Sequence, residues 1–233
     1  MADWRLGKGW TEPELVIHLN ALRERGVNFS TPPEEMTNDN GWIIDGCRNV
    51  PVGMEAPGPP VEQGHFERAR LALINYDFSD PSIVVGHFDP EVPFVGRDML
   101  LELKVLGFHF LSGCRVDSVR DETNGDRTTF GFRYDTLEGH IERGLEWFLL
   151  EKDHQTGRLT FTIEAHWRMG DFPNWWTRAG FHVMGNMMRS IWRRRAPRRL
   201  AKLAHQPFEA PIAPDGQLAH RGDDEPRRTE SSE

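Results

Sequence analysis

The sequence predicts an α+β protein in which an antiparallel meander sheet packs around a long C-terminal helix, with two shorter helices before the sheet. Three observations support this fold class. Apolar residues recur at helical spacing near the N-terminus, and they alternate with polar residues from about residue 82 to 168. After Pro173 they recur at helical spacing again. The short connections between the predicted strands favour antiparallel pairing.

The first helix is expected over residues 12–25. Thr11 can cap its N-terminus while Glu14 reaches back, which is the capping-box arrangement. Three leucines at helical spacing form its apolar side, namely Leu15, Leu19 and Leu22. Gly26 tolerates the left-handed φ that often ends a helix.

Residues 27–60 are expected to be irregular. The prolines between Pro51 and Pro60 fix φ and lack the amide donor that a regular helix or a central strand needs. A second, shorter helix follows at about residues 62–74, with Phe66 and Leu73 on one side.

Six strands are predicted next, and turn-forming residues separate them. In the last strand, apolar residues alternate with polar ones, so one face is expected to be buried and the other to be partly wet. Asn124-Gly125-Asp126 and Thr156-Gly157 mark two of the turns. The strands are residues 82–88, 99–110, 113–121, 128–135, 145–153 and 159–168.

A long helix is expected to start at Pro173 and Asn174, and Pro197 is expected to end or kink it. Its apolar stripe comprises Trp176, Gly180, Val183, Met184, Met187 and Ile191. Past about Gln206 the chain is polar and has no periodicity, which predicts a disordered tail. The chain is thus divided into an N-terminal helix with an irregular extension, a core domain and the tail. These parts are residues 1–60, 61–205 and 206–233.

Composition excludes several functional classes. The net charge of −8 argues against nucleic acid as a partner. The N-terminus has no apolar signal region, and no window reaches the roughly 18 apolar residues of a spanning helix, so a soluble, cytoplasmic protein without integral membrane contact is expected. The two cysteines form neither a disulfide framework nor a metal motif. Nucleophile, phosphate-loop and dinucleotide motifs are absent from the sequence, so no cofactor and no metal are predicted.

One hairpin motif is similar to that of a known family. Residues 130–144, FGFRYDTLEGHIERG, resemble the motif FGFAYGTLPGHPERGEE of uncharacterised protein family 0548, the domain of unknown function DUF1990. Residues 66–70, 93–97 and 162–165 carry further similarity, and the resemblance covers roughly residues 62–203. Glu138 stands where the family motif has proline, and Leu145 where it has glutamate. The resemblance implies a family but no reaction.

The order of predicted elements resembles the helix-grip architecture of the START and Bet v 1-like superfamily. In that architecture an antiparallel sheet wraps a long C-terminal helix. The usual member has a strand before its first helices, and no such strand is evident in this sequence.

The hairpin also contains the candidate catalytic residues. If residues 140–146 are extended, His140, Glu142 and Glu146 share one face, and Gly144 leaves a gap between them. Such a group could bind a ligand or perform acid–base chemistry. The alternative is structural: His140 braces a turn, and Glu146 requires a partner near the core. The candidate partners are Arg97, Arg133 and Arg143.

The leading functional hypothesis is a cavity between the sheet and the long helix that binds a small apolar or amphipathic molecule. Tyr134 is one of only two tyrosines and offers a polar anchor, while methionines adapt to varied apolar ligands. Ordinary core packing is the alternative for the helix stripe. The residues expected to contact the ligand are Arg97, Phe132, Tyr134, Trp176, Met184 and Met187.

Two further hypotheses belong to other functional classes. One is an enzyme that uses Tyr134, His140, Glu142 and Glu146 for proton transfer. The other is a non-catalytic interaction module that docks through the basic run Arg193–Lys202, for which a solvated helix face is the alternative reading.

Overall fold

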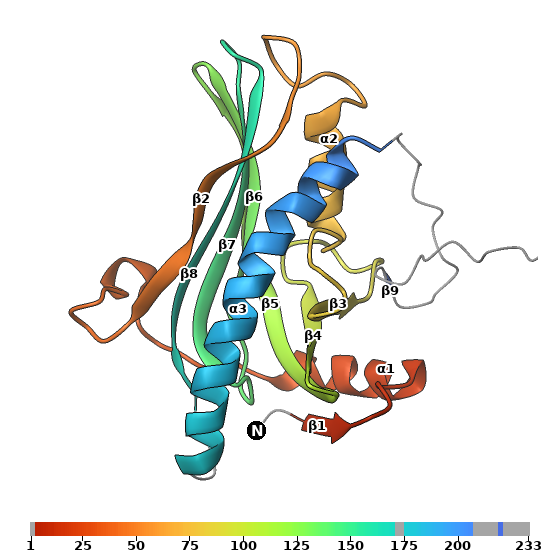
Figure 1. The fold of residues 1–233 in the computed structure, drawn as a ribbon, viewed down its shortest axis with the longest axis vertical. Coiled ribbons are helices and arrows are strands. Elements are labelled where there is room, and N and C mark those ends of the chain that lie inside the picture. The colour runs from red at the N-terminus through yellow and green to blue at the C-terminus, as the bar shows by residue number, and fades with distance from the viewer. Residues whose placement is uncertain (1–2, 171–174, 207–218, 221–233) are drawn as a thin grey trace, which may run out of the picture.

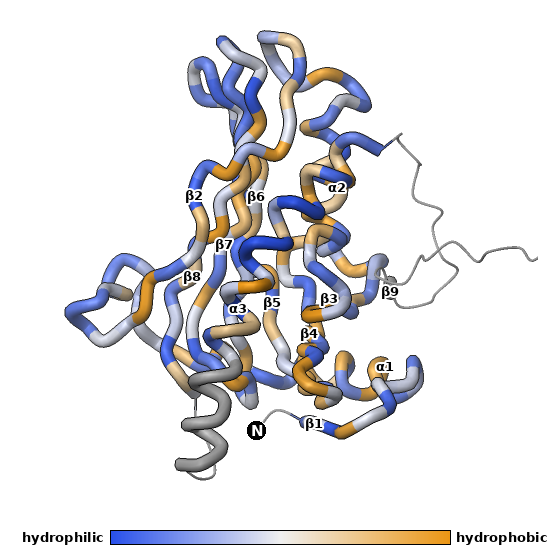
Figure 2. The backbone as a smooth tube through the Cα atoms, in the orientation of Figure 1, coloured by the Kyte–Doolittle hydropathy of each residue, from blue (hydrophilic) through white to orange (hydrophobic). Residues whose placement is uncertain are grey.

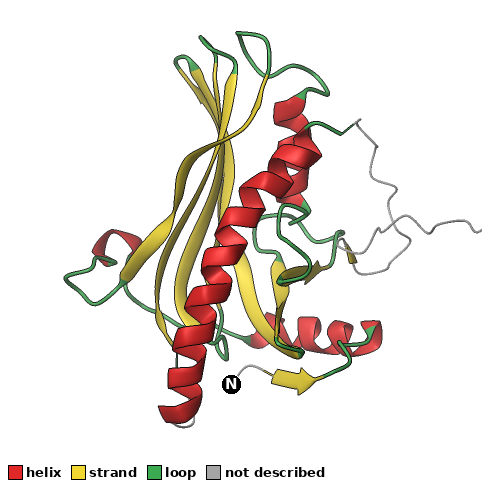
Figure 3. Ribbon diagram, in the orientation of Figure 1, coloured by secondary structure: helices red, strands yellow, loops and turns green. Residues whose placement is uncertain are grey.

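A computed structural model describes residues 3–170, 175–206 and 219–220, and within helix α3 it describes the side chains from residue 185 onward. The protein is α+β, as predicted. One antiparallel sheet carries the long helix α3 (Trp175–Ala204) along one face, and α2 (His65–Ile74) packs beside α3 (Figures 1 and 3). Helix α1 (Glu12–Ala21) lies near the lower end of the sheet in Figure 1.

The sheet has the order β2-β8-β7-β6-β5-β4-β3-β9, and β1 pairs with β5. Successive strands from β3 to β8 are neighbours, which is the predicted meander. The strands are β1 (Asp3–Leu6), β2 (Ile43–Met54), β3 (Val84–Phe88), β4 (Asp98–Val105), β5 (Phe108–Asn124), β6 (Arg127–Thr136), β7 (Glu142–Asp153), β8 (Arg158–Met169) and β9 (Ala219–His220). Most of the predicted tail lies outside the described residues.

The N-terminal third contributes more to the sheet than predicted. The expectation that residues 27–60 are irregular is wrong for residues 43–54, which form β2 and pair with β8. Strand β2 lies at the edge of the sheet and its register shifts on both sides of Val50-Pro51. A proline is tolerated at an edge or a bulge because no neighbouring strand needs its amide hydrogen. The short strand β1 before α1 was also not predicted.

The predicted strand 99–110 is divided by a tight turn at Leu106-Gly107. Both residues have positive φ, 49° and 79°, as a two-residue hairpin turn requires. Leucine rarely adopts this conformation, so its side chain gave no turn signal. Residues 108–110 therefore belong to β5, which continues to Asn124.

Helix boundaries also differ from the predictions. Helix α1 ends at Ala21 and a 3-10 turn, Leu22–Glu24, follows it. Its capping box is confirmed, because the Thr11 amide donates to the Glu14 carboxylate at 2.8 Å. Helix α3 does not end at Pro197 but continues to Ala204. Ala196, Leu200 and Ala204 are fully buried in this stretch, and their packing offsets the hydrogen bond that proline cannot make.

Both faces of the sheet are covered, and strand parity decides which residues face α3. Even-numbered residues of β7, such as Phe148 and Leu150, join the main core with Phe78 and Trp192. The odd-numbered Leu145 packs on the opposite face against Met36 and Trp42. Figure 2 shows hydrophobic residues along the middle of the strands and polar residues at the hairpin ends. Any polar residue at an even position of β7 therefore lies beneath or beside α3.

Candidate functional site

Glu146 is the centre of the candidate site. It lies at an even position of β7, opposite Tyr134 of β6, and the Tyr134 hydroxyl donates a hydrogen bond to Glu146 Oε2 at 2.5 Å. Tyr134 is 7% exposed, and the next inward residue on the same face, Phe148, is fully buried. Glu146 itself keeps part of its surface accessible. A carboxyl group is thus held among aromatic rings on a residue that is not fully enclosed.

Burial raises the pKa of Glu146 to about 7, although the hydrogen bond from Tyr134 acts in the opposite direction. Removal from water destabilises the charged form, and one neutral donor only partly offsets that penalty. The carboxyl group therefore exchanges its proton near neutral pH. A strongly shifted carboxyl group in partly accessible surroundings is typical of a functional site.

Both tyrosines of the chain meet at this carboxyl group. Tyr76, just after α2, lies close enough to Tyr134 and Glu146 for these groups to influence its proton. Burial and the nearby Glu146 raise the pKa of each tyrosine well above its usual value, so both stay protonated. The sequence prediction missed Tyr76, although the rarity of tyrosine beside fourteen Phe was a usable signal.

Two ion pairs connect α3 to the sheet beside this centre. Arg189 pairs with Glu142 of β7, and Arg193, one helical turn later, pairs with Asp45 of β2. The Arg189 guanidinium also lies over the Trp167 ring, 3.8 Å from its centroid. Burial lowers the pKa of each arginine to about 10, so both remain charged at neutral pH. These pairs hold the helix against the face that presents Glu146.

Some arginines of the basic run at the end of α3 also bind to other parts of the protein. Arg195 pairs with Asp80 at 2.9 Å, and Arg199 donates to the Asp77 carbonyl at 2.6 Å. Arg194 and Arg198 are exposed. Part of the run therefore makes contacts within the protein, which favours a structural role for these arginines over docking.

His140 braces the turn between β6 and β7. Its Nδ1 accepts the amide hydrogen of Glu142 at 2.9 Å. Burial, together with the nearby Arg189 cation, lowers the pKa of His140 to about 3, so the ring is neutral. Gly139 has a φ of 87° in this turn. Gly144 has a φ of 147°, and an added Cβ would lie 1.9 Å from the His166 carbonyl oxygen, so only glycine fits.

The candidate catalytic residues therefore do not converge on one reacting atom. His140 is engaged by backbone, Glu142 by Arg189, and Glu146 by Tyr134. In the described contacts the partner of Glu146 is Tyr134, and two of the candidate arginines bind elsewhere. Arg97 donates to the Val92 carbonyl. Arg133 pairs with Asp117 and Asp135 on the other side of the strand.

The residues predicted to contact a ligand differ in their position and exposure. Tyr134 lies at the site, but Phe132 is fully buried among Phe94 and Phe148 and has no accessible surface. Met187 is 47% exposed, whereas the adjacent Met188 packs against the main core. The side chains of Trp176 and Met184 lie outside the described residues.

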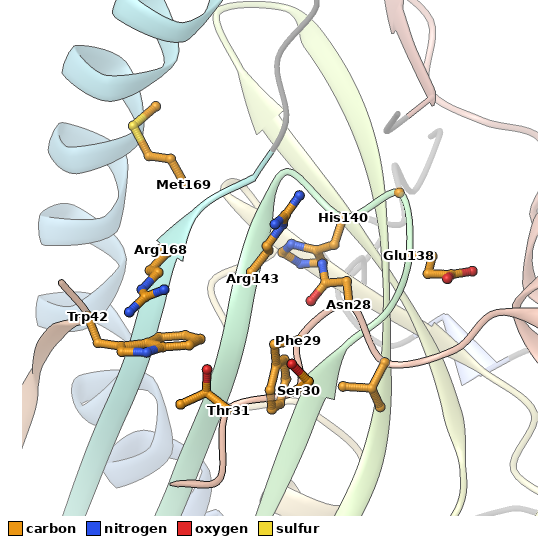
Figure 4. A pocket seen from close by; sticks show the side chains of 12 residues that line it. Asn28, Phe29, Ser30, Thr31, Trp42, Glu138, His140, Arg143, Arg168 and Met169 are labelled. Atoms are coloured by element: carbon orange, nitrogen blue, oxygen red, sulfur yellow. The ribbon is translucent and has the colours of Figure 1, made fainter. Parts of the chain in front are cut away.

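A separate cleft of about 740 Å³ lies at the β6–β7 turn (Figure 4). Residues 27–31 and the turn residues 138–140 line it, together with Trp42, Arg143, Arg168 and Met169. Trp167 touches Arg189 of α3, so its neighbour Arg168 points to the opposite face of the sheet. The cleft therefore opens mainly on the face away from Glu146.

The described residues contain no metal-binding group and no membrane-spanning helix. No group of three or more His, Cys, Asp or Glu side chains there is arranged to hold a metal ion. None of the helices in those ranges combines the length and the apolarity needed to cross a bilayer. Burial raises the pKa of the Cys47 and Cys114 thiols, which lowers the thiolate fraction of both.

Comparisons with known proteins give one family and distant structural similarity. The family model "Domain of unknown function (DUF1990)" matches residues 41–198 and so includes β2. A "UPF0548 protein" of Dictyostelium discoideum is 32% identical over 87 residues; the match spans 37% of this chain and 40% of that protein. The crystal structure of Ara h 8.0201 aligns with a TM-score of 0.39 and 10% identity, over 69% of this chain and 97% of that one.

Proposed function

We propose that this chain, which belongs to the DUF1990 family of domains of unknown function, binds a small, largely apolar molecule between the sheet and α3. Glu146 and Tyr134 are its polar anchor. The ligand class is an apolar body with one hydroxyl or N–H group that donates to the Glu146 carboxylate. Aromatic surroundings with few polar groups are typical of small-molecule sites.

The observation that carries this proposal is the buried carboxyl group of Glu146 and its raised pKa. A carboxyl group with a pKa of about 7 destabilises the fold at neutral pH compared with an amide or an apolar residue. Such a cost is expected where the group is kept for function. Its partial accessibility leaves room for a second hydrogen-bonding partner besides Tyr134.

Binding is better supported than acid–base catalysis. Catalysis needs several groups within about 3 Å of one substrate atom. Only Glu146 among the three candidate catalytic residues lacks an ion-pair or backbone partner in the described contacts. The tyrosines keep their protons because their pKa values are raised. These groups are therefore suited to hold a ligand.

The test compares 1-naphthol with naphthalene, which share an apolar body and differ by one hydroxyl. Titration at pH 8, followed through Trp fluorescence, is expected to show tighter binding of 1-naphthol. Glu146→Leu should weaken 1-naphthol binding roughly tenfold, because one hydrogen bond to a charged group is lost. Naphthalene binding should not weaken.

The matched control is Glu151→Leu, on the same strand but on the opposite face. It should leave the affinity for both compounds unchanged. Absence of binding by either compound to the wild-type protein at millimolar concentration would contradict the proposal. So would equal affinity of the Glu146→Leu and wild-type proteins for 1-naphthol.

A further inference from the structure

We infer that the 740 Å³ cleft at the β6–β7 turn is a separate binding site for a small organic anion with an apolar body. This inference does not depend on a ligand beneath α3, because the cleft opens mainly on the other face of the sheet. Its volume falls within the range of small-molecule sites, roughly 300–1,000 Å³.

The walls of the cleft are preformed by hydrogen bonds. The Asn28 side chain donates to the Glu142 carbonyl at 2.9 Å, and the Asn28 amide donates to the Thr136 carbonyl at 3.1 Å. Val27 forms a β-bridge with Leu137. The segment that forms one wall is thus fixed to the hairpin that forms the other, which lowers the ordering cost of binding.

The charge of the cleft favours an anion. Arg143 of β7 and Arg168 of β8 are directly paired in register, so the two guanidinium groups share one face. Among the described lining residues one carboxylate, Glu138, is present, and Figure 4 shows it at the opposite side from Arg168. Arg168 thus gives the cleft a cationic side on a chain with a net charge of −8.

Two donors beside the cleft lack acceptors in the described part of the chain. They are Nε of Arg168 and Nε1 of Trp42, both buried. The contacts of Arg168 are the Asn40 carbonyl and the Trp42 ring, 4.4 Å away, and neither carries a negative charge. Buried N–H groups without acceptors are costly, and a carboxylate or phosphate presents oxygens that suit a guanidinium edge. Both donors belong to residues that line the cleft, so an anion bound there would lie beside both residues.

The apolar part of the cleft defines the rest of the ligand. Phe29 packs edge-on against Trp42 with ring centroids 6.2 Å apart. Val27 and Met169 also line the space. A ligand with a flat or short aliphatic body and one anionic group would fill both parts.

The experiment follows the Trp42 indole N–H by NMR, with its resonance assigned through Trp42→Phe. Addition of 1-naphthoate to the wild-type protein is expected to shift this resonance in a saturable way. The neutral analogue 1-naphthalenemethanol should produce a much smaller shift. Raising the salt concentration should weaken 1-naphthoate binding, because the attraction is partly electrostatic.

Arg168→Met should weaken 1-naphthoate binding roughly tenfold or more through loss of a charge-assisted contact. Arg158→Met is the matched control, since Arg158 is exposed at the other end of the same strand. It should leave the affinity unchanged. If circular dichroism shows that Arg168→Met is unfolded, the inference is tested by comparing the charged and the neutral ligand on the wild-type protein. No shift at Trp42, equal binding of both ligands, or equal loss in both arginine variants would overturn the inference.

Discussion

Glu146→Gln is expected to raise the free energy of unfolding by about 2–3 kcal/mol at pH 8 and to leave it nearly unchanged at pH 4. The reason is that Glu146 is charged in the folded protein at pH 8 but protonated at pH 4. The folded-state pKa is about 7, against 4.5 for the unperturbed group. Glutamine accepts the same hydrogen bond from Tyr134 without a charge to bury.

The sign of this effect follows from proton binding. Between pH 4.5 and about 7 the folded protein holds a proton on Glu146 that the unfolded chain has released. Stability of the wild-type protein therefore falls as pH rises through this window. Above it the full penalty is present, with an upper bound of about 3 kcal/mol that the partial exposure of Glu146 reduces. Below it the penalty is absent.

Urea denaturation at pH 4 and pH 8 checks this expectation. Glu122→Gln, an exposed glutamate on β5, is the control and should change stability by less than about 0.5 kcal/mol at either pH. Loss of stability in Glu146→Gln at pH 8 would count against the account. A gain of equal size at both pH values would also do so, because it would not come from the proton.

Lys152→Met is expected to lower the free energy of unfolding by about 3–5 kcal/mol, the largest loss predicted for this chain. The Lys152 side chain is fully buried, and its Nζ donates to Glu55 Oε2 at 2.5 Å and to the Pro59 carbonyl at 2.8 Å. Glu55 also accepts the amide of Phe66 at 2.7 Å, at the start of α2. Removal of the lysine leaves the Glu55 charge buried without its cation.

A double-mutant cycle with Glu55→Gln measures this coupling by chemical denaturation. The double variant should be more stable than Lys152→Met alone, because the uncompensated carboxylate is gone. Additive effects of the two changes would show that the two side chains do not interact. A loss below about 1 kcal/mol for Lys152→Met would show that the buried pair is not needed.

Sequence periodicity predicted the meander and the face of Glu146, because both depend on local alternation of side chains. It did not find β2, since Gly46 and Pro51 interrupt the pattern there and only pairing with β8 makes the segment a strand. The turn at Leu106 was hidden for a related reason, because its left-handed φ is imposed by the hairpin.

The candidate site was only partly predictable. Parity placed Glu146 toward the core, and burial required a partner for it. An arginine was expected, yet the partner is Tyr134, and a second tyrosine, Tyr76, comes from a distant part of the chain. The cleft lined by Trp42 and Arg168 was not predicted, because it joins segments more than a hundred residues apart.

The most direct test of the account is the titration of the Glu146 side-chain carboxyl carbon by NMR, with the resonance assigned through Glu146→Gln. We predict that Glu146 titrates with a midpoint near pH 7 in the free protein and that this midpoint changes when 1-naphthol is bound. A midpoint near 4.5 that does not respond to 1-naphthol would contradict it.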